Sequence, residues 1–242
     1  MARRPELYLP AARLAARRGI VCRETDIVIE GYPRCANSFA EAAFRVAQNS
    51  AVRMGHHSHA PAQVLAAVRW GIPTVVLFRD PDDAVVSRMM RSEWMTARSA
   101  YEEYNWFYQS IWPSIDNCVL SSFELTTRSF GEVIERVNVR YNTSFARFDD
   151  ADKQEVRKAF GLVDSLACDR IGQCTDYSQQ RGSRALYDRE KRKAQLHEQV
   201  KSKEFAALRR RAADIYGALL DRTPRSSARS PGNEVDARAE AD

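Results

Sequence analysis

Residues 26–48 read DIVIEGYPRCANSFAEAAFRVAQ, an apolar run followed by a polar turn and a helical pattern. The run is rich in β-branched residues and ends at Gly31 and Pro33, which is typical of a buried strand that enters a tight loop. From Ser38 onward apolar side chains recur at helical spacing, and Asn37 or Ser38 is chemically suited to cap that helix. The stretch predicts a strand, a short loop and a helix.

The same alternation continues along the chain. Further strands are predicted at 51–54, 74–78 and 118–123, and further helices at 61–70, from Pro81, at 99–112 and at 129–139. Alternating strands and helices favour a parallel sheet covered on both faces. We therefore predict an α/β fold with three layers, α/β/α, around a central parallel sheet. Beyond Asp150 the strand signal fades, and apolar residues at helical spacing from Leu196 to Leu219 predict a helical C-terminal part with possible interruptions.

The composition suits one domain. The chain has 242 residues, of which 44% are hydrophobic, enough for one sizeable core. We predict a single domain over residues 1–222. Residues 223–242 combine Pro, Gly, Ser and charge with little to bury, which predicts a disordered tail.

Cysteine usage and hydropathy favour a cytoplasmic protein. The five cysteines form no CxxC pair and leave one over if paired, so neither a disulfide framework nor a zinc site is indicated. Arginines interrupt the apolar stretch near the N-terminus, and no apolar run is long enough to span a membrane, so we expect no secretory leader and no membrane span. The net charge of +5 is compatible with phosphorylated small molecules or polyanions as partners.

Two segments carry residues suited to phosphate binding. The first, YPRCANS at 32–38, offers backbone N–H groups at a helix start, the charge of Arg34, and donors on Asn37 and Ser38. The second, RDPDDAVVS at 79–87, places Arg79 at a strand end and Ser87 on the next helix, where both could reach one phosphate. Taken alone, each segment is equally compatible with a capped helix start, with Arg79 paired to a neighbouring aspartate. No GxxxxGK[ST] pattern is present, which disfavours ordinary ATP or GTP hydrolysis.

Four segments in order resemble the sulfotransferase family that uses 3′-phosphoadenosine 5′-phosphosulfate (PAPS). YPRCANSF, HSHAP at 57–61, RDPDDAVVS and VLSSFEL at 119–125 are similar to the family's YPKSGTTW, THLP, RNPKDVAVS and YEDL segments. The resemblance covers residues 1–140. It implies a P-loop NTPase-like sulfotransferase fold and transfer of a sulfuryl group from PAPS to a hydroxyl acceptor, leaving the bisphosphate PAP, without a metal.

The resemblance also implies roles for individual residues. His59 aligns with the family's catalytic base, and Arg34 with the lysine that contacts the transferring group. Nucleotide contacts are implied for Arg34, Cys35, Ala36, Asn37, Ser38, Phe39, Arg79 and Ser87, and for Arg181 and Gly182, the best match to a late RKG segment. Arg34 replaces a lysine, Ala36 a glycine and Phe39 a tryptophan, so we expect a differently shaped loop or a reduced activity.

His59 has two neighbours that compete for its role. A cluster with His56 and His57 could bind a metal, but no Cys or carboxylate lies nearby in sequence to complete a shell, so we expect no metal. On a strand, His57 and His59 would share a face and His56 would point away. A structural histidine remains an alternative.

Other functions stay open at this point. The chain could be a binding module with a degenerate nucleotide site, whose basic C-terminal helix engages a polyanion, or a P-loop-like kinase of a small alcohol. A basic run is usually a solvated helix face, so we expect no nucleic-acid partner. The aromatic stretch 94–112 could line a pocket for a carbohydrate, a glycolipid or a phenol, with a glycan favoured by analogy. The sequence gives no indication of the oligomeric state.

Overall fold

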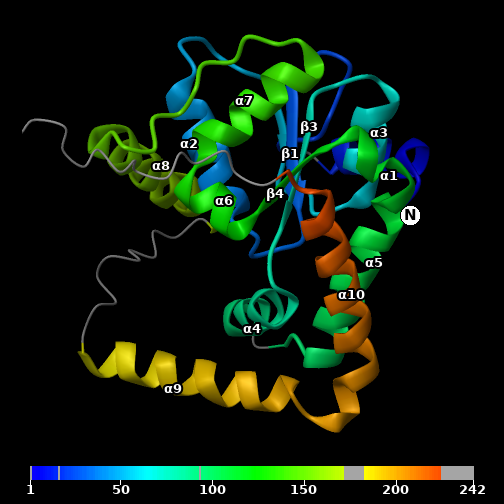
Figure 1. The fold of residues 1–242 in the computed structure, drawn as a ribbon, viewed down its shortest axis with the longest axis vertical. Helices are drawn as coiled ribbons and strands as arrows, with labels where there is room; N and C mark the ends of the chain where they lie inside the picture. Colours follow the sequence, from blue (N-terminus) through cyan, green and yellow to red (C-terminus); the bar gives the residue numbers. More distant parts are fainter. Residues whose placement is uncertain (1, 16, 93, 172–182, 225–242) are drawn as a thin grey trace, which may run out of the picture.

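The computed structural model describes residues 2–15, 17–92, 94–171 and 183–224. Its centre is a sheet of four parallel strands in the order β2-β1-β3-β4 (Figure 1). The strands are β1 (Ile27–Gly31), β2 (Met54–His56), β3 (Thr74–Phe78) and β4 (Val119–Ser122). The predicted central parallel sheet is confirmed.

The order of the strands creates a switch point between β1 and β3. From β1 the chain moves to β2 on one side, and then returns across β1 to β3 on the other side. The register pairs Glu30 with Val76 and Gly31 with Leu77, so β1 and β3 end side by side. In open α/β sheets, ligands bind beyond the carboxyl ends of the strands at such a point. The loops that follow β1 and β3 contain Arg34 and Arg79.

Helices cover both faces of the sheet (Figure 1). One face carries α2 (Asn37–Ala47), α6 (Phe123–Arg128), α7 (Phe130–Tyr141) and α8 (Lys153–Ile171). The other carries α1 (Pro5–Leu14), α3 (Pro61–Arg69) and α5 (Ala97–Ile111), followed by a 3₁₀ turn at Trp112–Asn117. The three-layer α/β/α architecture is therefore confirmed. Most of the sheet is fully buried between the layers, including the side chains of Ile27, Ile29 and Leu77.

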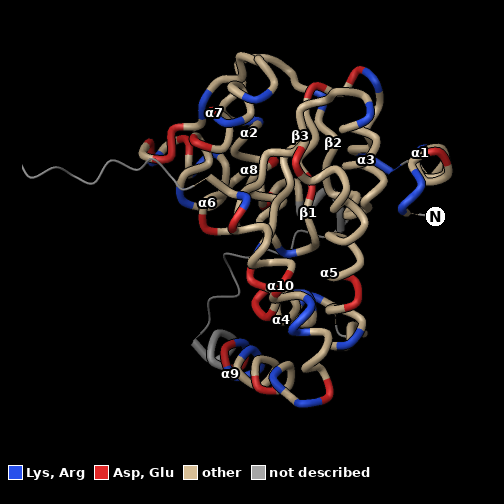
Figure 2. The backbone as a smooth tube through the Cα atoms, turned by 45° about the vertical axis from the view of Figure 1, so that its right-hand side comes forward, with Lys and Arg blue, Asp and Glu red and all other residues tan. Residues whose placement is uncertain are grey.

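The C-terminal part is helical and interrupted, as predicted. It consists of α9 (Ser183–Val200), a 3₁₀ turn at Lys203–Phe205 and α10 (Ala206–Arg222). Helix α10 packs on α5, and α9 packs on α4 (Pro81–Arg91). Figure 2 shows that α9 carries charges of both signs, as a solvated helix face does. In the predicted tail, residues 225–242 lie outside the described residues. Among the helices described, none has the length and apolar character needed to cross a membrane.

Two local predictions were wrong. Strand β2 begins at Met54 rather than at residue 51, because β1 sets the register and its first residue, Ile27, pairs with Met54. Helix α6 was not predicted; Ser122 caps it through Oγ, which accepts a 3.1 Å hydrogen bond from the Leu125 N–H.

Candidate functional site

The loop after β1 is a tight turn with two left-handed residues. Arg34 has φ 73° and Ala36 has φ 66°, a region that favours glycine and that other residues occupy at a cost of about 1–2 kcal/mol. The Asn37 side-chain amide donates a 3.0 Å hydrogen bond to the Tyr32 carbonyl and closes the turn. Ala36, not Asn37 or Ser38, is the N-cap of α2, and no side chain caps this helix, so the predicted cap was wrong. The amide of Asn37 closes the loop instead.

Two side chains of the loop point into the core. Cys35 is fully buried, with its thiol 3.6 Å from the Tyr108 hydroxyl, and burial raises the pKa of the Cys35 thiol to about 12. Asn37 is also buried. These contacts fix the loop against the sheet. The predicted contact of Cys35 and Asn37 with a nucleotide stays a prediction.

The two predicted phosphate-binding segments meet beyond β1 and β3. Arg34 Nε donates a 2.9 Å hydrogen bond to Ser87 Oγ on α4. Arg79 at the end of β3 donates from its guanidinium to the Arg34 carbonyl at 3.4 Å. The structure thus brings Arg34, Arg79 and Ser87 together, as both segments require if they serve one ligand.

Besides the Arg34 carbonyl, the Arg79 guanidinium contacts two further side chains. Its guanidinium carbon lies 4.0 Å from the centroid of the Phe123 ring, a cation–π contact. Its NH2 group lies 3.4 Å from Asp83 Oδ2, so the alternative pairing with a neighbouring aspartate is also present. The neighbouring Asp82 is instead paired with Arg209 at 2.7 Å. Phe123 was missed by the sequence analysis, because it is one of several aromatic residues and only its place after β4 distinguishes it.

The His59 ring is oriented by a backbone carbonyl. Nδ1 of His59 lies 2.8 Å from the Gly31 carbonyl oxygen. A carbonyl oxygen only accepts, so the proton of the neutral ring is on Nδ1 and the lone pair is on Nε2. This tautomer is the one that a base acting through Nε2 requires. His59 has φ 49°, so its backbone is also held in a strained conformation.

The Glu30 side chain contacts the backbone and lies near the ring of His59, and it was missed by the sequence analysis. Its carboxylate is fully buried and accepts hydrogen bonds from the Ser58 N–H at 2.7 Å, the His59 N–H at 3.2 Å and Gln63 Nε2 at 3.0 Å. Glu30 Oε2 is 3.9 Å from His59 Nδ1. Burial raises the pKa of Glu30 to about 7. The signal in the sequence is a single acid inside an apolar strand, which needs buried partners.

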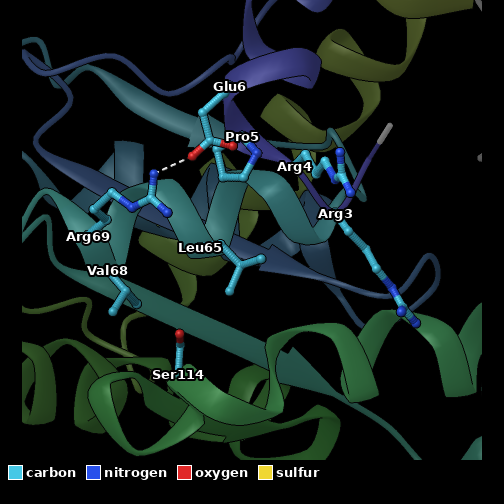
Figure 3. Close-up of a pocket in the computed structure, with 8 residues that line it drawn as sticks. All are labelled: Arg3, Arg4, Pro5, Glu6, Leu65, Val68, Arg69 and Ser114. Atoms are coloured by element: carbon cyan, nitrogen blue, oxygen red, sulfur yellow. Dashed lines mark hydrogen bonds and ion pairs between the residues drawn. The ribbon is translucent and has the colours of Figure 1, made fainter.

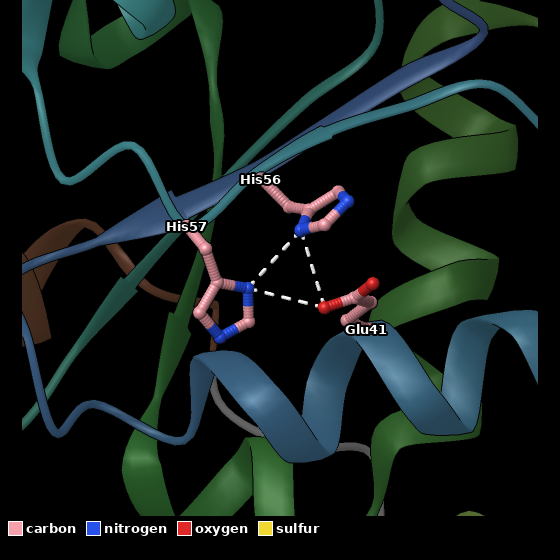
Figure 4. Close-up of side chains that lie close together, drawn as sticks. All are labelled: Glu41, His56 and His57. Atoms are coloured by element: carbon pink, nitrogen blue, oxygen red, sulfur yellow. Dashed lines mark hydrogen bonds and ion pairs between the residues drawn. The ribbon is translucent and has the colours of Figure 1, made fainter. Parts of the chain in front are cut away.

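His56 and His57 both face Glu41 on α2 (Figure 4). The expectation that His56 points away from His57 was wrong, because β2 ends at His56 and His57 turns the chain with φ 53°. Burial alone would raise the pKa of Glu41, but hydrogen bonds from the two histidines outweigh it and hold that pKa well below its usual range. His57 Nε2 lies 3.1 Å from Ser38 Oγ, which connects the group to the loop.

The remaining predicted residues lie apart from this group. Phe39 packs among Phe130, Phe148 and Phe160, with ring centroids 5.4 to 6.4 Å away. Arg181 and Gly182 lie outside the described residues. Of the aromatic stretch 94–112, the side chains of Tyr101, Tyr104 and Tyr108 are buried in the core, so most of that stretch supports the fold rather than a pocket.

Three cavities lie elsewhere on the described part of the chain. One has a volume of about 380 Å³ and lies between the start of α1 and α3. Figure 3 shows its lining residues, among them Glu6, which pairs with Arg69. A second of about 510 Å³ lies between β4, α7 and the end of α10, and a third of about 400 Å³ lies between α4 and α10. Arg34, Arg79 and His59 line none of the three.

Comparisons with known proteins give a distant structural likeness. No protein-family model matches the sequence, and no curated protein matches it. Among solved structures, the chain is similar to the crystal structure of the mouse sulfotransferase SULT7A1 complexed with PAP. The two chains are 10% identical, with 87% of this chain and 95% of that chain covered and a TM-score of 0.41.

Proposed function

We propose that this protein is a sulfotransferase that uses PAPS as donor and a hydroxyl-bearing molecule as acceptor. The observation that carries the proposal is the 2.9 Å hydrogen bond from Arg34 to Ser87, with Arg79 donating to the Arg34 carbonyl at 3.4 Å. It joins two segments that share no secondary-structure element, at the carboxyl ends of β1 and β3. Two fixed guanidinium groups and a hydroxyl at that place suit a nucleotide with phosphates at both ends of its ribose.

In the proposed donor site the loop 32–38 holds the 5′-phosphosulfate, and Arg79 with Ser87 holds the 3′-phosphate. The backbone of the loop lies at the start of α2, where N–H groups favour negative charge. Arg34 stands between the two positions and provides charge where the leaving phosphate becomes more negative.

The transfer step follows from the tautomer of His59. Nε2 of His59 takes the proton of the acceptor hydroxyl as its oxygen attacks sulfur. The new oxygen–sulfur bond forms while the bond from sulfur to the 5′-phosphate oxygen breaks, and PAP leaves with the negative charge. The protonated ring keeps its Nδ1–H bond to Gly31 and lies beside the Glu30 carboxyl. No metal takes part in this step.

The acceptor is proposed by class only. We propose a small molecule or a glycan hydroxyl; an aromatic ring on the described surface that could support it is Trp94, which follows α4 and is 75% exposed beside Arg88. Exposed aromatic rings are common supports for sugar faces and for phenols. Cys22, Cys35 and Cys118 are free thiols, which suits the cytoplasm, the compartment we propose.

Calorimetry with PAP tests the donor site. The wild-type chain is expected to bind one PAP, and Arg79→Ala to reduce the affinity at least roughly tenfold, since a charge-assisted hydrogen bond is worth about 1.5–3 kcal/mol. Arg147→Ala, a substitution of an exposed arginine on the α7–α8 connection, should leave the affinity unchanged. ATP, which lacks the 3′-phosphate, should bind much more weakly. Absence of PAP binding by the wild type would contradict the proposal.

A transfer assay tests the chemistry separately. PAPS and a panel of glycans, phenols and small alcohols are incubated with the chain, and sulfated product is detected by mass spectrometry. His59→Gln is expected to keep its affinity for PAP. The rate of product formation should fall at least roughly a hundredfold, because a general base accelerates a reaction by about 10²–10⁴-fold. PAP binding without product from any acceptor would favour a binding module over an enzyme.

A further inference from the structure

We propose that Glu41, His56 and His57 form a binding site for a divalent transition-metal ion, with Zn²⁺ the best fit. The site is distinct from the sulfuryl-transfer step and takes no part in it. Three potential ligand atoms converge on one point from two elements, α2 and the end of β2 (Figure 4).

The distances match a metal coordination shell. Glu41 Oε2 lies 3.2 Å from His56 Nδ1 and 3.1 Å from His57 Nδ1, and the two Nδ1 atoms are 3.1 Å apart. In a tetrahedral zinc site with bonds of about 2.0–2.1 Å, neighbouring ligand atoms are separated by about 3.3 Å. The triangle is therefore close to one face of such a tetrahedron and needs little adjustment. Its other ligand position is left for water or a fourth group.

With both histidine rings neutral, no placement of their protons makes all three short contacts favourable hydrogen bonds. Arg45 donates to His56 Nε2 at 3.4 Å, so the neutral ring of His56 carries its proton on Nδ1. If His57 Nδ1 also carries a proton, both N–H groups donate to the same Glu41 oxygen, and the two Nδ1 atoms, 3.1 Å apart, have no hydrogen bond between them. If it carries a lone pair, that pair opposes the Glu41 carboxylate, which is ionised because it pairs with Arg45 at 3.1 Å. A cation in the centre is attracted by all three atoms.

The backbone is held in the conformation that convergence requires. Successive residues of a strand point to opposite faces, yet His56 and His57 meet on one side because His57 adopts φ 53°. Such a conformation costs free energy in a non-glycine residue and is found where function requires it. Gly19 packs directly on His56: a Cβ there would lie 2.7 Å from the His56 carbonyl oxygen and 3.0 Å from its ring. The ring is thus fixed before any ligand arrives.

The nature of the ligands selects the metal. Two imidazole nitrogens and one carboxylate suit Zn²⁺ and related first-row ions, whereas Mg²⁺ and Ca²⁺ prefer oxygen ligands. When His57 binds metal through Nδ1, its Nε2–H can donate to Ser38 Oγ at 3.1 Å, the kind of outer contact that orients metal-bound histidines. Binding through His56 Nδ1 moves the proton of that ring to Nε2, so the Arg45 side chain, 34% exposed, must turn away.

The experiment is a titration of the chelator-treated full chain with Zn²⁺ by calorimetry, and with Co²⁺ by visible absorption. The wild type is expected to bind one equivalent and to develop the Co²⁺ bands of a four-coordinate site. Glu41→Gln and His57→Gln should each weaken binding at least roughly tenfold. His197→Gln, a substitution of a histidine on α9 outside the group, is the matched control and should bind like the wild type. The proposal would be overturned if the double variant His56→Gln, His57→Gln bound Zn²⁺ as tightly as the wild type, or if the wild type did not bind Zn²⁺.

A second variant guards against loss of folding in the buried positions. Arg45→Gln removes a competing donor and a nearby positive charge, and its side-chain oxygen can accept from His56 Nε2–H. It is expected to bind Zn²⁺ more tightly than the wild type, by roughly tenfold. Binding equal to or weaker than the wild type by this variant, when circular dichroism shows a folded chain, would also contradict the proposal.

Discussion

Arg34 and Ser87, 53 residues apart in the chain, are joined by a 2.9 Å hydrogen bond from the guanidinium Nε to the hydroxyl oxygen. The contact exists because β1 and β3 are neighbours in the sheet and end at the same level. Arg34 lies in the loop after β1, and Ser87 lies on the helix after β3. A ligand that bridges the two loops would replace or share this bond, so the residues are already positioned before it binds.

Ser87→Ala tests that bridge with a closely matched control. Removal of the hydroxyl is expected to weaken PAP binding roughly tenfold, since it removes one hydrogen bond to a charged group. Ser92→Ala removes the C-cap serine of α4, which also accepts a 2.9 Å hydrogen bond from an arginine, Arg88. That variant should bind PAP like the wild type in calorimetry. Equal effects of both substitutions would mean that the hydroxyl of Ser87 serves the helix and not a ligand.

Ala36→Gly is expected to stabilise the fold. The left-handed conformation costs alanine about 1–2 kcal/mol, whereas glycine adopts it freely but loses more entropy on folding, so the net gain should be about 0.5–1 kcal/mol. Urea denaturation measures the change in the free energy of unfolding. Ala213→Gly, in the interior of α10, is the control with the opposite sign and should lose about 1 kcal/mol. A loss of stability in Ala36→Gly would show that the methyl group is needed in the loop.

Glu30 predicts a pH dependence of stability. Burial raises its pKa from 4.5 to about 7, so between these values the folded chain holds a proton that the unfolded chain has released. The free energy of unfolding should therefore fall as pH rises through this window, by roughly 3 kcal/mol in total from this group.

Glu30→Gln should remove that slope, whatever it does to stability at a single pH. Urea denaturation from pH 4.5 to 8 gives the slope for each variant. Glu204→Gln, at an exposed acid paired with Arg98, should keep the slope of the wild type. If Glu30→Gln also keeps it, Glu30 is ionised throughout this range in the folded chain.

The sequence was sufficient for the framework of the fold. β-Branched runs such as 74–78 fill buried parallel strands almost regardless of context, and the helices that follow them are marked by proline and acidic residues, as at Pro81 and Asp82. Strand β2 was misplaced because three residues carry little pattern of their own, and its position depends on pairing with β1.

The site could be predicted only where its residues belong to short segments that directly follow a predicted strand. Arg34, Arg79 and Ser87 were identified from local patterns, and the structure brings them together. Glu41 was missed because it lies on α2, far from His56 in sequence. The two side chains meet only because α2 packs on the sheet. The strand rule also failed at His57, since a left-handed residue reverses the side on which a side chain lies.

The position of β1 has a consequence for how the candidate site is lost on heating. This strand has neighbours on both sides and provides Glu30, the Gly31 carbonyl and the loop that begins at Tyr32. We therefore expect its amides to be among those that exchange hydrogen only when the whole domain opens, so the groups that β1 provides should stay in place until then. Loss of PAP binding on heating and global unfolding should coincide, so the melting curve should also describe the loss of the proposed donor site.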